Sequence, residues 1–234
     1  MRWGTSRPWS GRERASRPLL PGPLRLPAAS LLAACVAVTA VLGMSIVGRG
    51  LPEWLDSAFD PRIQAALGRF PSLLNWLPDL GTLGPVTLMT LALVLACLAT
   101  RRWTGAVLAA VAEPAATGLT EYVLKPYVGE PIGQAFPSGH ATSMFALAAI
   151  CAVLLVDPPR RQVPGTVRLL GVFMALLLAA AVAAAMVAMG AHRFTDAVGG
   201  AAVGIAVVLA CALTLDLVAS RRPREPAAPP LPGG

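Results

Sequence analysis

The chain has 234 residues, of which 56% are hydrophobic and only 13% charged, and its net charge is +7. A soluble domain is typically about half apolar and about a quarter charged, so this composition excludes an ordinary soluble protein and favours an integral membrane protein. The 18 arginines against a single lysine are a composition typical of a GC-rich bacterial genome.

Six apolar segments each approach the roughly 20 residues that a helix needs to cross a bilayer. They are 28–47, 82–100, 104–123, 139–156, 167–189 and 197–219. Ala, Val, Leu and Gly dominate these segments, and small residues allow helices to pack closely in lipid. We therefore predict an all-α fold, a polytopic six-transmembrane-helix bundle that forms one domain over residues 28–219.

The two ends of the chain differ from this domain in composition. Residues 1–27 are rich in Arg and Pro and residues 220–234 are rich in Pro, so both are predicted to be disordered tails. The first apolar run is long, and the following "GMSIVGRG" lacks a small-residue cleavage site. We therefore predict an uncleaved first helix and not a signal peptide.

The positions of the basic residues predict the orientation in the membrane. When the six segments cross the bilayer in order, 14 of the 19 basic residues lie on the side that holds both termini. The positive-inside rule then places both termini in the cytoplasm of a multi-pass cell-membrane protein. Because the basic charge is accounted for by topology, we expect no nucleic acid partner. The 14 residues are Arg2, Arg7, Arg12, Arg14, Arg17, Arg25, Arg101, Arg102, Arg160, Arg161, Arg168, Arg221, Arg222 and Arg224.

The connection over residues 48–81 is long and faces outward in this topology. Trp54, Leu55, Phe59, Ile63 and Leu67 recur in it at near-helical spacing. Two interpretations remain open: an amphipathic helix lying on the outer leaflet, with Trp at the headgroup boundary, or a cap packed over the end of the bundle.

The third apolar segment carries the carboxylates Glu113 and Glu121 and is followed by Lys125. Carboxylates at membrane depth are costly, and they usually face the interior of a bundle or a polar cavity. Glu121 and Lys125 are four residues apart and can pair on one helix face. Glu113 precedes Pro114 and is either a structural partner of a kink or a functional group.

Three polar patches fall at helix ends on the outer side: "LKPYVGEPIGQ", "FPSGHATS" and "GAHRFTD". They contain the only lysine, Lys125, and the only histidines, His140 and His192. Such a concentration of singular residues predicts one pocket assembled from three connections.

The first two patches have the chemistry of an anion site. Ser138 can cap the fourth helix, and Gly139 allows a ligand to approach the backbone closely. The free amides and the positive dipole end of that helix attract anions. Lys125 adds a point charge suited to phosphate oxygens.

The third patch has the chemistry of a nucleophile. His192 and Asp196 are four residues apart, so one helical turn would bring them together. A carboxylate that holds one imidazole nitrogen leaves the other nucleophilic, and His140 could then protonate a leaving oxygen. This pattern predicts phosphoryl transfer through a phosphohistidine without a metal or cofactor. The alternatives are structural histidines at a helix mouth and a metal site formed by His140, His192 and Asp196.

These residues resemble the motifs of the type 2 phosphatidic acid phosphatase superfamily, membrane lipid phosphatases related to vanadium haloperoxidases. That family has three blocks, K-x6-R-P, P-S-G-H and S-R-x5-H-x3-D. Here the second is complete at residues 137–140, the third retains His192 and Asp196, and the first retains Lys125. The resemblance covers about 80–219 and implies a six-helix order with an outward-facing site.

The resemblance also implies a role for each matching residue. His192 would be the nucleophile, Asp196 its orienting partner and His140 the acid that protonates the leaving group. Lys125, Ser138 and Gly139 would hold the phosphate. The implied substrate is a lipid phosphate or diphosphate whose headgroup reaches the extracytoplasmic leaflet.

The chain departs from the family at two phosphate-binding arginines, which are replaced by Ile132 and Met186. Arg193, next to His192, is a candidate substitute for one of them, although neighbours in a helix point to different sides. Two functions therefore follow: a divergent lipid phosphatase or phosphotransferase, and a non-catalytic member that binds lipid phosphates or acts as a scaffold or transporter.

Overall fold

The structure is a computed structural model that describes residues 18–47, 53–128, 136–156 and 164–221. All regular elements in these ranges are helical, which confirms the predicted all-α fold. In chain order they are α2 (Gly22–Val47), α3 (Glu53–Leu67), α4 (Pro71–Trp76), the 3₁₀ turn η1 (Pro78–Gly81), α5 (Leu83–Ala99), α6 (Trp103–Leu119), the π-helical turn η2 (Thr120–Leu124), α7 (Lys125–Val128), α8 (Gly139–Val156), α9 (Gly165–Ala188) and α10 (Phe194–Arg221).

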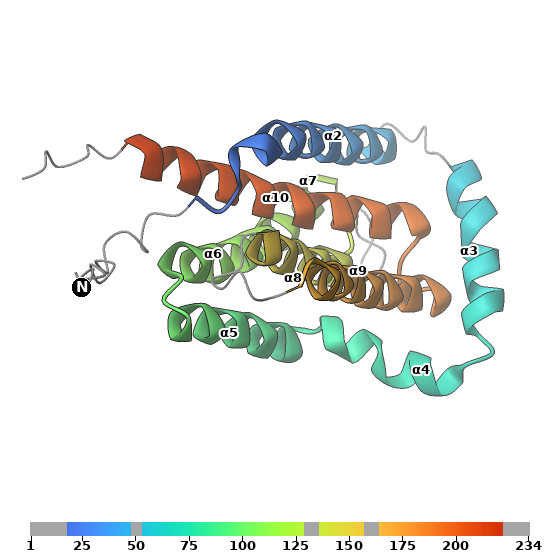
Figure 1. The fold of residues 1–234 in the computed structure, drawn as a ribbon. Helices are drawn as coiled ribbons and strands as arrows, with labels where there is room; N and C mark the ends of the chain where they lie inside the picture. Colours follow the sequence, from blue (N-terminus) through green and yellow to red (C-terminus); the bar gives the residue numbers. More distant parts are fainter. Residues whose placement is uncertain (1–17, 48–52, 129–135, 157–163, 222–234) are drawn as a thin grey trace, which may run out of the picture.

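Each of the six predicted apolar segments forms a long helix, and these helices run alongside one another as a bundle (Figure 1). The central one is α8, in which 61% of the residues are buried. It contacts α5, α6, α9 and α10. Its inward-facing residues are mostly small, so its neighbours approach closely. The helix that carries the Pro-Ser-Gly-His motif at its start is therefore the core of the bundle.

Helix length and composition support a membrane protein but not the predicted number of spans. By these criteria α2, α8, α9 and α10 are each long and apolar enough to cross a membrane. The segments Pro71–Gly81 and Leu83–Ala99, bent by 60°, make a fifth if they are taken as one broken span. Because α6 has only 17 residues before the π-helical turn, the count of six is not confirmed. That count and the cytoplasmic termini stay predictions.

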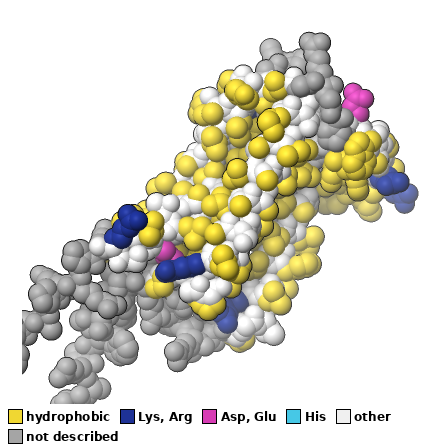
Figure 2. Space-filling model, turned by 90° about the horizontal axis from the view of Figure 1, so that it is seen from above, with side chains coloured by type: hydrophobic (Ala, Val, Ile, Leu, Met, Phe, Trp, Pro, Cys, Tyr) yellow, Lys and Arg dark blue, Asp and Glu magenta, His cyan; other side chains and the backbone are white. Residues whose placement is uncertain are grey.

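Large apolar side chains cover much of the outside of the bundle. Leu88 is 68% exposed, Leu169 72% and Phe173 58%. On the face seen in Figure 2, hydrophobic side chains dominate and the few visible charged ones lie toward its ends. A surface of this kind suits contact with lipid, where exposed apolar groups carry no penalty.

The N-terminal boundary of the helical domain lies earlier than predicted. The sequence places a disordered tail up to residue 27, but α2 begins at Gly22, and Leu19 and Leu20 are buried. Their backbone amides donate to the two carboxylate oxygens of Asp216 at 2.6 and 2.9 Å. This contact between residues about 200 positions apart holds the segment against the end of α10. Residues 1–17 and 222–234, which make up the rest of the two predicted tails, lie outside the described residues.

The connection at 48–81 contains α3, α4 and η1, and α3 lies across the end of the bundle (Figure 1). The ring of Phe59 on α3 stacks on that of Phe194 at the start of α10, with 4.5 Å between the centroids. Of the two interpretations left open by the sequence, these contacts support the packed cap.

The contact between α8 and α10 depends on three glycines. A Cβ atom at Gly200 would overlap the carbonyl oxygen of Ser138, and one at Gly199 would overlap the ring of Phe136. A Cβ atom at Gly204 would likewise overlap the carbonyl oxygen of Thr142. Small residues thus let the two backbones touch, as is common for helices in membranes.

Substituting Gly204 by Ala should therefore push α10 away from α8. Since backbone atoms cannot move aside as a flexible side chain can, we expect a loss of about 1–3 kcal/mol of stability. Thermal unfolding of the detergent-purified protein measures this as a lower midpoint. The control is Gly84→Ala on α5, where nothing lies within 4 Å of the added atom. Equal midpoints for the two variants would contradict the proposed packing constraint.

Candidate active site

The Pro-Ser-Gly-His motif forms the N-terminus of α8, and Ser138 caps the helix as predicted. Its Oγ atom accepts a hydrogen bond from the Ala141 amide at 3.4 Å, and its carbonyl oxygen accepts one from the Thr142 amide. The Ser138 amide donates to the carbonyl oxygen of Asp196 at 3.0 Å. Ser138 is completely buried, so its side chain serves the helix start. The bond to Asp196 joins the two motifs directly.

His192 follows a tight helix ending that the sequence analysis missed. Gly190 has a φ of 70°, a left-handed conformation that favours glycine. The amides of Gly190 and Ala191 each donate to a carbonyl of the last turn of α9, those of Val187 and Met186 respectively, both at 3.0 Å. This is the hydrogen-bond pattern of a Schellman ending. The sequence signal for this helix ending was Gly190, because glycine commonly terminates helices.

His192 and Asp196 meet at the start of α10, as their spacing predicts. The His192 Nδ1 atom lies 3.6 Å from Asp196 Oδ2, which also accepts the Arg193 amide at 3.0 Å. The side chains of His192 and Asp196 are 10% and 1% exposed. Nδ1 has no hydrogen-bond partner among the described residues, and catalytic hydrogen bonds are often long before substrate binds. The carboxylate thus faces one ring nitrogen and leaves Nε2 for other contacts.

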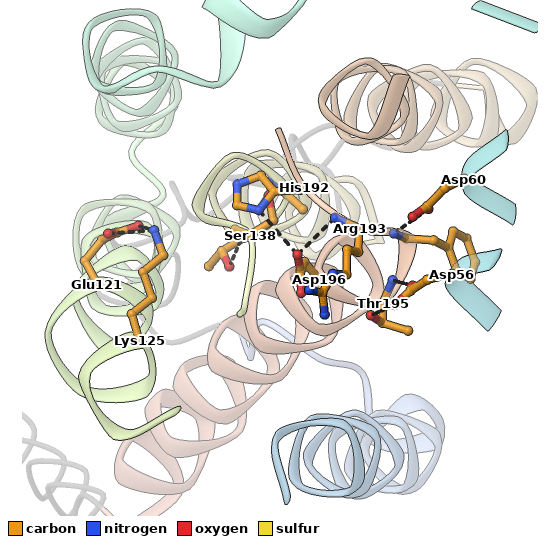
Figure 3. A network of polar contacts seen from close by, with 12 residues as sticks. Asp56, Asp60, Glu121, Lys125, Ser138, His192, Arg193, Thr195 and Asp196 are labelled. Carbon is orange, nitrogen blue, oxygen red and sulfur yellow. Dashed lines mark hydrogen bonds and ion pairs between the residues drawn. The ribbon is translucent and has the colours of Figure 1, made fainter. Parts of the chain in front are cut away.

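Two aspartates of α3 hold the same helix start from the other side (Figure 3). Asp56 accepts hydrogen bonds from the amide and the hydroxyl of Thr195, at 2.9 and 3.0 Å. Asp60 accepts one from the Phe194 amide at 2.9 Å, and its partial burial raises the pKa of its carboxyl group above the ordinary value. Sequence reasoning missed both residues. The available signal was their spacing of four, which puts them on one face of the connecting helix.

A cavity of about 400 Å³ lies between α3 and the His192 turn. Arg193 lines it beside the acidic residues of α3. The phosphate-binding role expected of Arg193 stays a prediction. The lining residues are Glu53, Asp56, Ser57, Asp60, Pro61, Gln64, Gly190, His192 and Arg193.

Lys125 and Glu121 form the ion pair that the sequence predicted. Lys125 Nζ lies 2.6 Å from Glu121 Oε1 and 2.8 Å from Oε2. Glu121 lies in the π-helical turn and Lys125 directly follows that turn, where the Lys125 amide donates to the Thr120 carbonyl. It lies against the first residue of α8, because a Cβ atom on Gly139 would overlap Glu121 Oε1. Figure 3 shows Glu121 and Lys125 pointing toward one another, apart from the group around Asp196.

His140, in the first turn of α8, packs against η1. A Cβ atom on Gly81 would lie 2.7 Å from the Cδ2 atom of its ring. The starts of α8 and α10 are joined by the Ser138–Asp196 hydrogen bond, and the Glu121–Lys125 pair lies against Gly139. The cavity beside His192 includes none of His140, Lys125 and Ser138, so one pocket formed by all three patches stays a prediction.

Within the described ranges, no three His, Cys, Asp or Glu side chains converge in a way that could hold a metal ion. This includes the alternative set of His140, His192 and Asp196. Of the two replaced arginine positions, Ile132 lies outside the described residues, and Met186 belongs to the last turns of α9.

Glu113 lies in the interior of the bundle, only 6% exposed. Its carboxylate accepts a hydrogen bond from the Thr117 hydroxyl at 2.8 Å, and Thr117 lies 2.9 Å from the Ser143 hydroxyl on α8. These contacts form a polar bridge between α6 and α8. They support the structural interpretation of Glu113.

Asp56→Ala should weaken the attachment of α3 to the start of α10. The substitution leaves the amide and the hydroxyl of Thr195 buried without their partner, which costs about 1–3 kcal/mol. We expect a lower thermal midpoint in detergent, whereas Ser57→Ala, a change at an exposed neighbour bonded only to its own helix, should leave it unchanged. A midpoint for Asp56→Ala equal to that of Ser57→Ala would rule out this role.

Comparison with known proteins agrees with the geometry. The family model described as the PAP2 superfamily matches residues 26–218. No curated protein and no solved structure gives a significant match. The match covers most of the chain and all three polar patches. The chain therefore belongs to the PAP2 superfamily.

Proposed function

We propose that this protein is an integral-membrane phosphatase that hydrolyses a lipid phosphate or diphosphate through a phosphohistidine at His192. Members of the PAP2 superfamily are generally phosphatases. The observation that carries the proposal is the placement of His192 Nδ1 at 3.6 Å from the buried Asp196 carboxylate. A solvent-facing structural histidine needs no such partner.

The first step is attack on phosphorus by His192 Nε2. As the N–P bond forms, the bond from phosphorus to the lipid oxygen breaks, and that oxygen leaves as an alkoxide or, from a diphosphate, as a phosphate. Asp196 stabilises the positive ring that results, and the Arg193 amide and the α10 backbone keep Asp196 in place.

His140 is proposed to move the proton in both steps. As a general acid it protonates the leaving oxygen. It then accepts a proton from a water molecule that attacks the phosphohistidine, which releases inorganic phosphate and restores His192. Its place in the first turn of α8, two residues after the Ser138 amide that bonds Asp196, supports this assignment.

Lys125 and the first turn of α8 are proposed to bind the phosphate. The Ser138 amide is engaged by Asp196 and its hydroxyl caps the helix, so Ser138 acts mainly by shaping the site. Gly139 and His140 begin the helix, where amides lack intrahelical acceptors and the dipole favours an anion. With both family arginines replaced, the lysine and the helix end supply most of the positive potential.

The apolar outer surface and the position of the site at one end of the bundle support a lipid substrate. The positive-inside rule favours an extracytoplasmic site in the cell membrane. The absence of an arginine at Met186 favours a second candidate, a family member that binds lipid phosphates without hydrolysing them or acts as a scaffold or transporter.

Phosphate release from polyprenyl diphosphate, phosphatidic acid and phosphatidylglycerol phosphate separates the two candidates. The purified wild-type protein should release phosphate from at least one of them. His192→Ala should be slower by about 100-fold or more, because it lacks the nucleophile. If the wild type releases no more phosphate than His192→Ala from any lipid, the enzyme proposal fails and the binding role remains.

Asp196→Asn should lower kcat by about 10²–10⁴-fold with little change in KM, since an amide neither selects the tautomer nor stabilises a cationic ring. The control is Asp216→Asn, which alters a buried carboxylate at the opposite end of the same helix. Its kcat, normalised to folded protein, should stay within about twofold of wild type. Similar kcat losses in both variants would point to a general effect of perturbing α10.

A further inference from the structure

A carboxylate already lies at the place where the proposed function puts the phosphate. Glu121 holds the only lysine of the chain with both carboxylate oxygens, at 2.6 and 2.8 Å. The same carboxylate contacts Gly139, the first residue of α8. It therefore lies beside both groups that would bind a phosphate oxygen, the ammonium group and the helix start.

The local backbone favours this arrangement. The helical path from α6 to α7 contains the π-helical turn η2, which begins at Thr120, just before Glu121, and ends just before Lys125. π-Helical turns are rare and frequently occur at functional sites. Glu121 remains 38% exposed and Lys125 23% exposed, so neither is locked into the interior. The pair can separate when a stronger anion arrives.

Charge determines what this pair does to a ligand. A carboxylate beside a phosphate repels it, and while paired it cancels the charge of the lysine that would attract it. In this chain the cancellation matters more because the two arginines expected by the family are absent. The site therefore has weak net attraction for a small free anion.

We propose that Glu121 occupies the position of a phosphate oxygen in the ligand-free protein and lowers the affinity of the site for phosphate. This inference rests on the proposed function, because it takes Lys125 and the start of α8 as the phosphate site. A lipid substrate has its apolar chain as a further source of binding and can displace the carboxylate. The free phosphate product has none and is released.

The competing role for Glu121 is to orient Lys125 toward the substrate, and the two roles predict opposite signs. Glu121→Gln keeps the size and the hydrogen-bond acceptor but removes the charge. If Glu121 competes with phosphate, the variant binds orthophosphate more tightly; if it positions Lys125, the variant binds orthophosphate equally or more weakly.

The experiment measures orthophosphate binding to the full-length protein in detergent by calorimetric titration. We expect Glu121→Gln to bind about tenfold more tightly than wild type, a factor typical of one nearby charge in a partly exposed site. The control is Asp216→Asn, which removes a carboxylate at the opposite end of α10 from the site and should change the affinity by less than about twofold. No gain for Glu121→Gln over wild type, including no measurable binding by either protein, overturns the inference.

Two further variants tie the gain to the proposed place and separate it from catalysis. In Lys125→Met/Glu121→Gln, the tighter binding should be lost; if it persists, phosphate does not bind at Lys125 and the inference is wrong. The titration is repeated in His192→Ala, which cannot turn over. A gain there without lipid hydrolysis by wild type would refute the proposed enzyme and support the inference. Lipid hydrolysis that depends on His192, without tighter orthophosphate binding by Glu121→Gln, would support the proposed enzyme and refute the inference.

Discussion

The backbone contact between α8 and α10 is the constraint on which the site depends. Glycines at 199, 200 and 204 bring α10 so close that a single Cβ atom would meet backbone or ring atoms of the opposite segment. At this distance the Ser138 amide reaches the carbonyl oxygen of Asp196. The motif that begins α8 and the motif that begins α10 are thereby joined by one hydrogen bond. A wider spacing would break this bond.

Carboxylates lie at the starts of both helices, but they make different contacts there. At α10, Asp56, Asp60 and Asp196 bond the first backbone amides directly, so that helix end is already satisfied. At α8, Glu121 contacts Gly139 while bonded to a lysine and stays partly exposed. The contacts at the start of α10 therefore fix the position of His192. At the start of α8, by contrast, another anion can replace the Glu121 carboxylate.

Much of the fold could be predicted because apolar segments of membrane length leave few alternatives to helices. The histidine and lysine residues of the site could be identified because they are the only ones in the chain. The Glu121–Lys125 pair followed from helical spacing alone. Errors occurred where a distant residue decides the local structure. Leu19 and Leu20, for example, are ordered because their amides meet a carboxylate some 200 residues away.

By itself, then, the sequence determined the helical class, the three polar patches and the chemistry of the residues in them, because composition and local spacing are sufficient for these. Only the tertiary structure decided that α3 caps α10 with two aspartates, that Ser138 is tied to Asp196, and that Glu121 lies on Gly139. Each of these depends on how closely segments remote in the chain approach. A local pattern such as the glycines of α10 allows a close approach, but it does not specify which segment packs there.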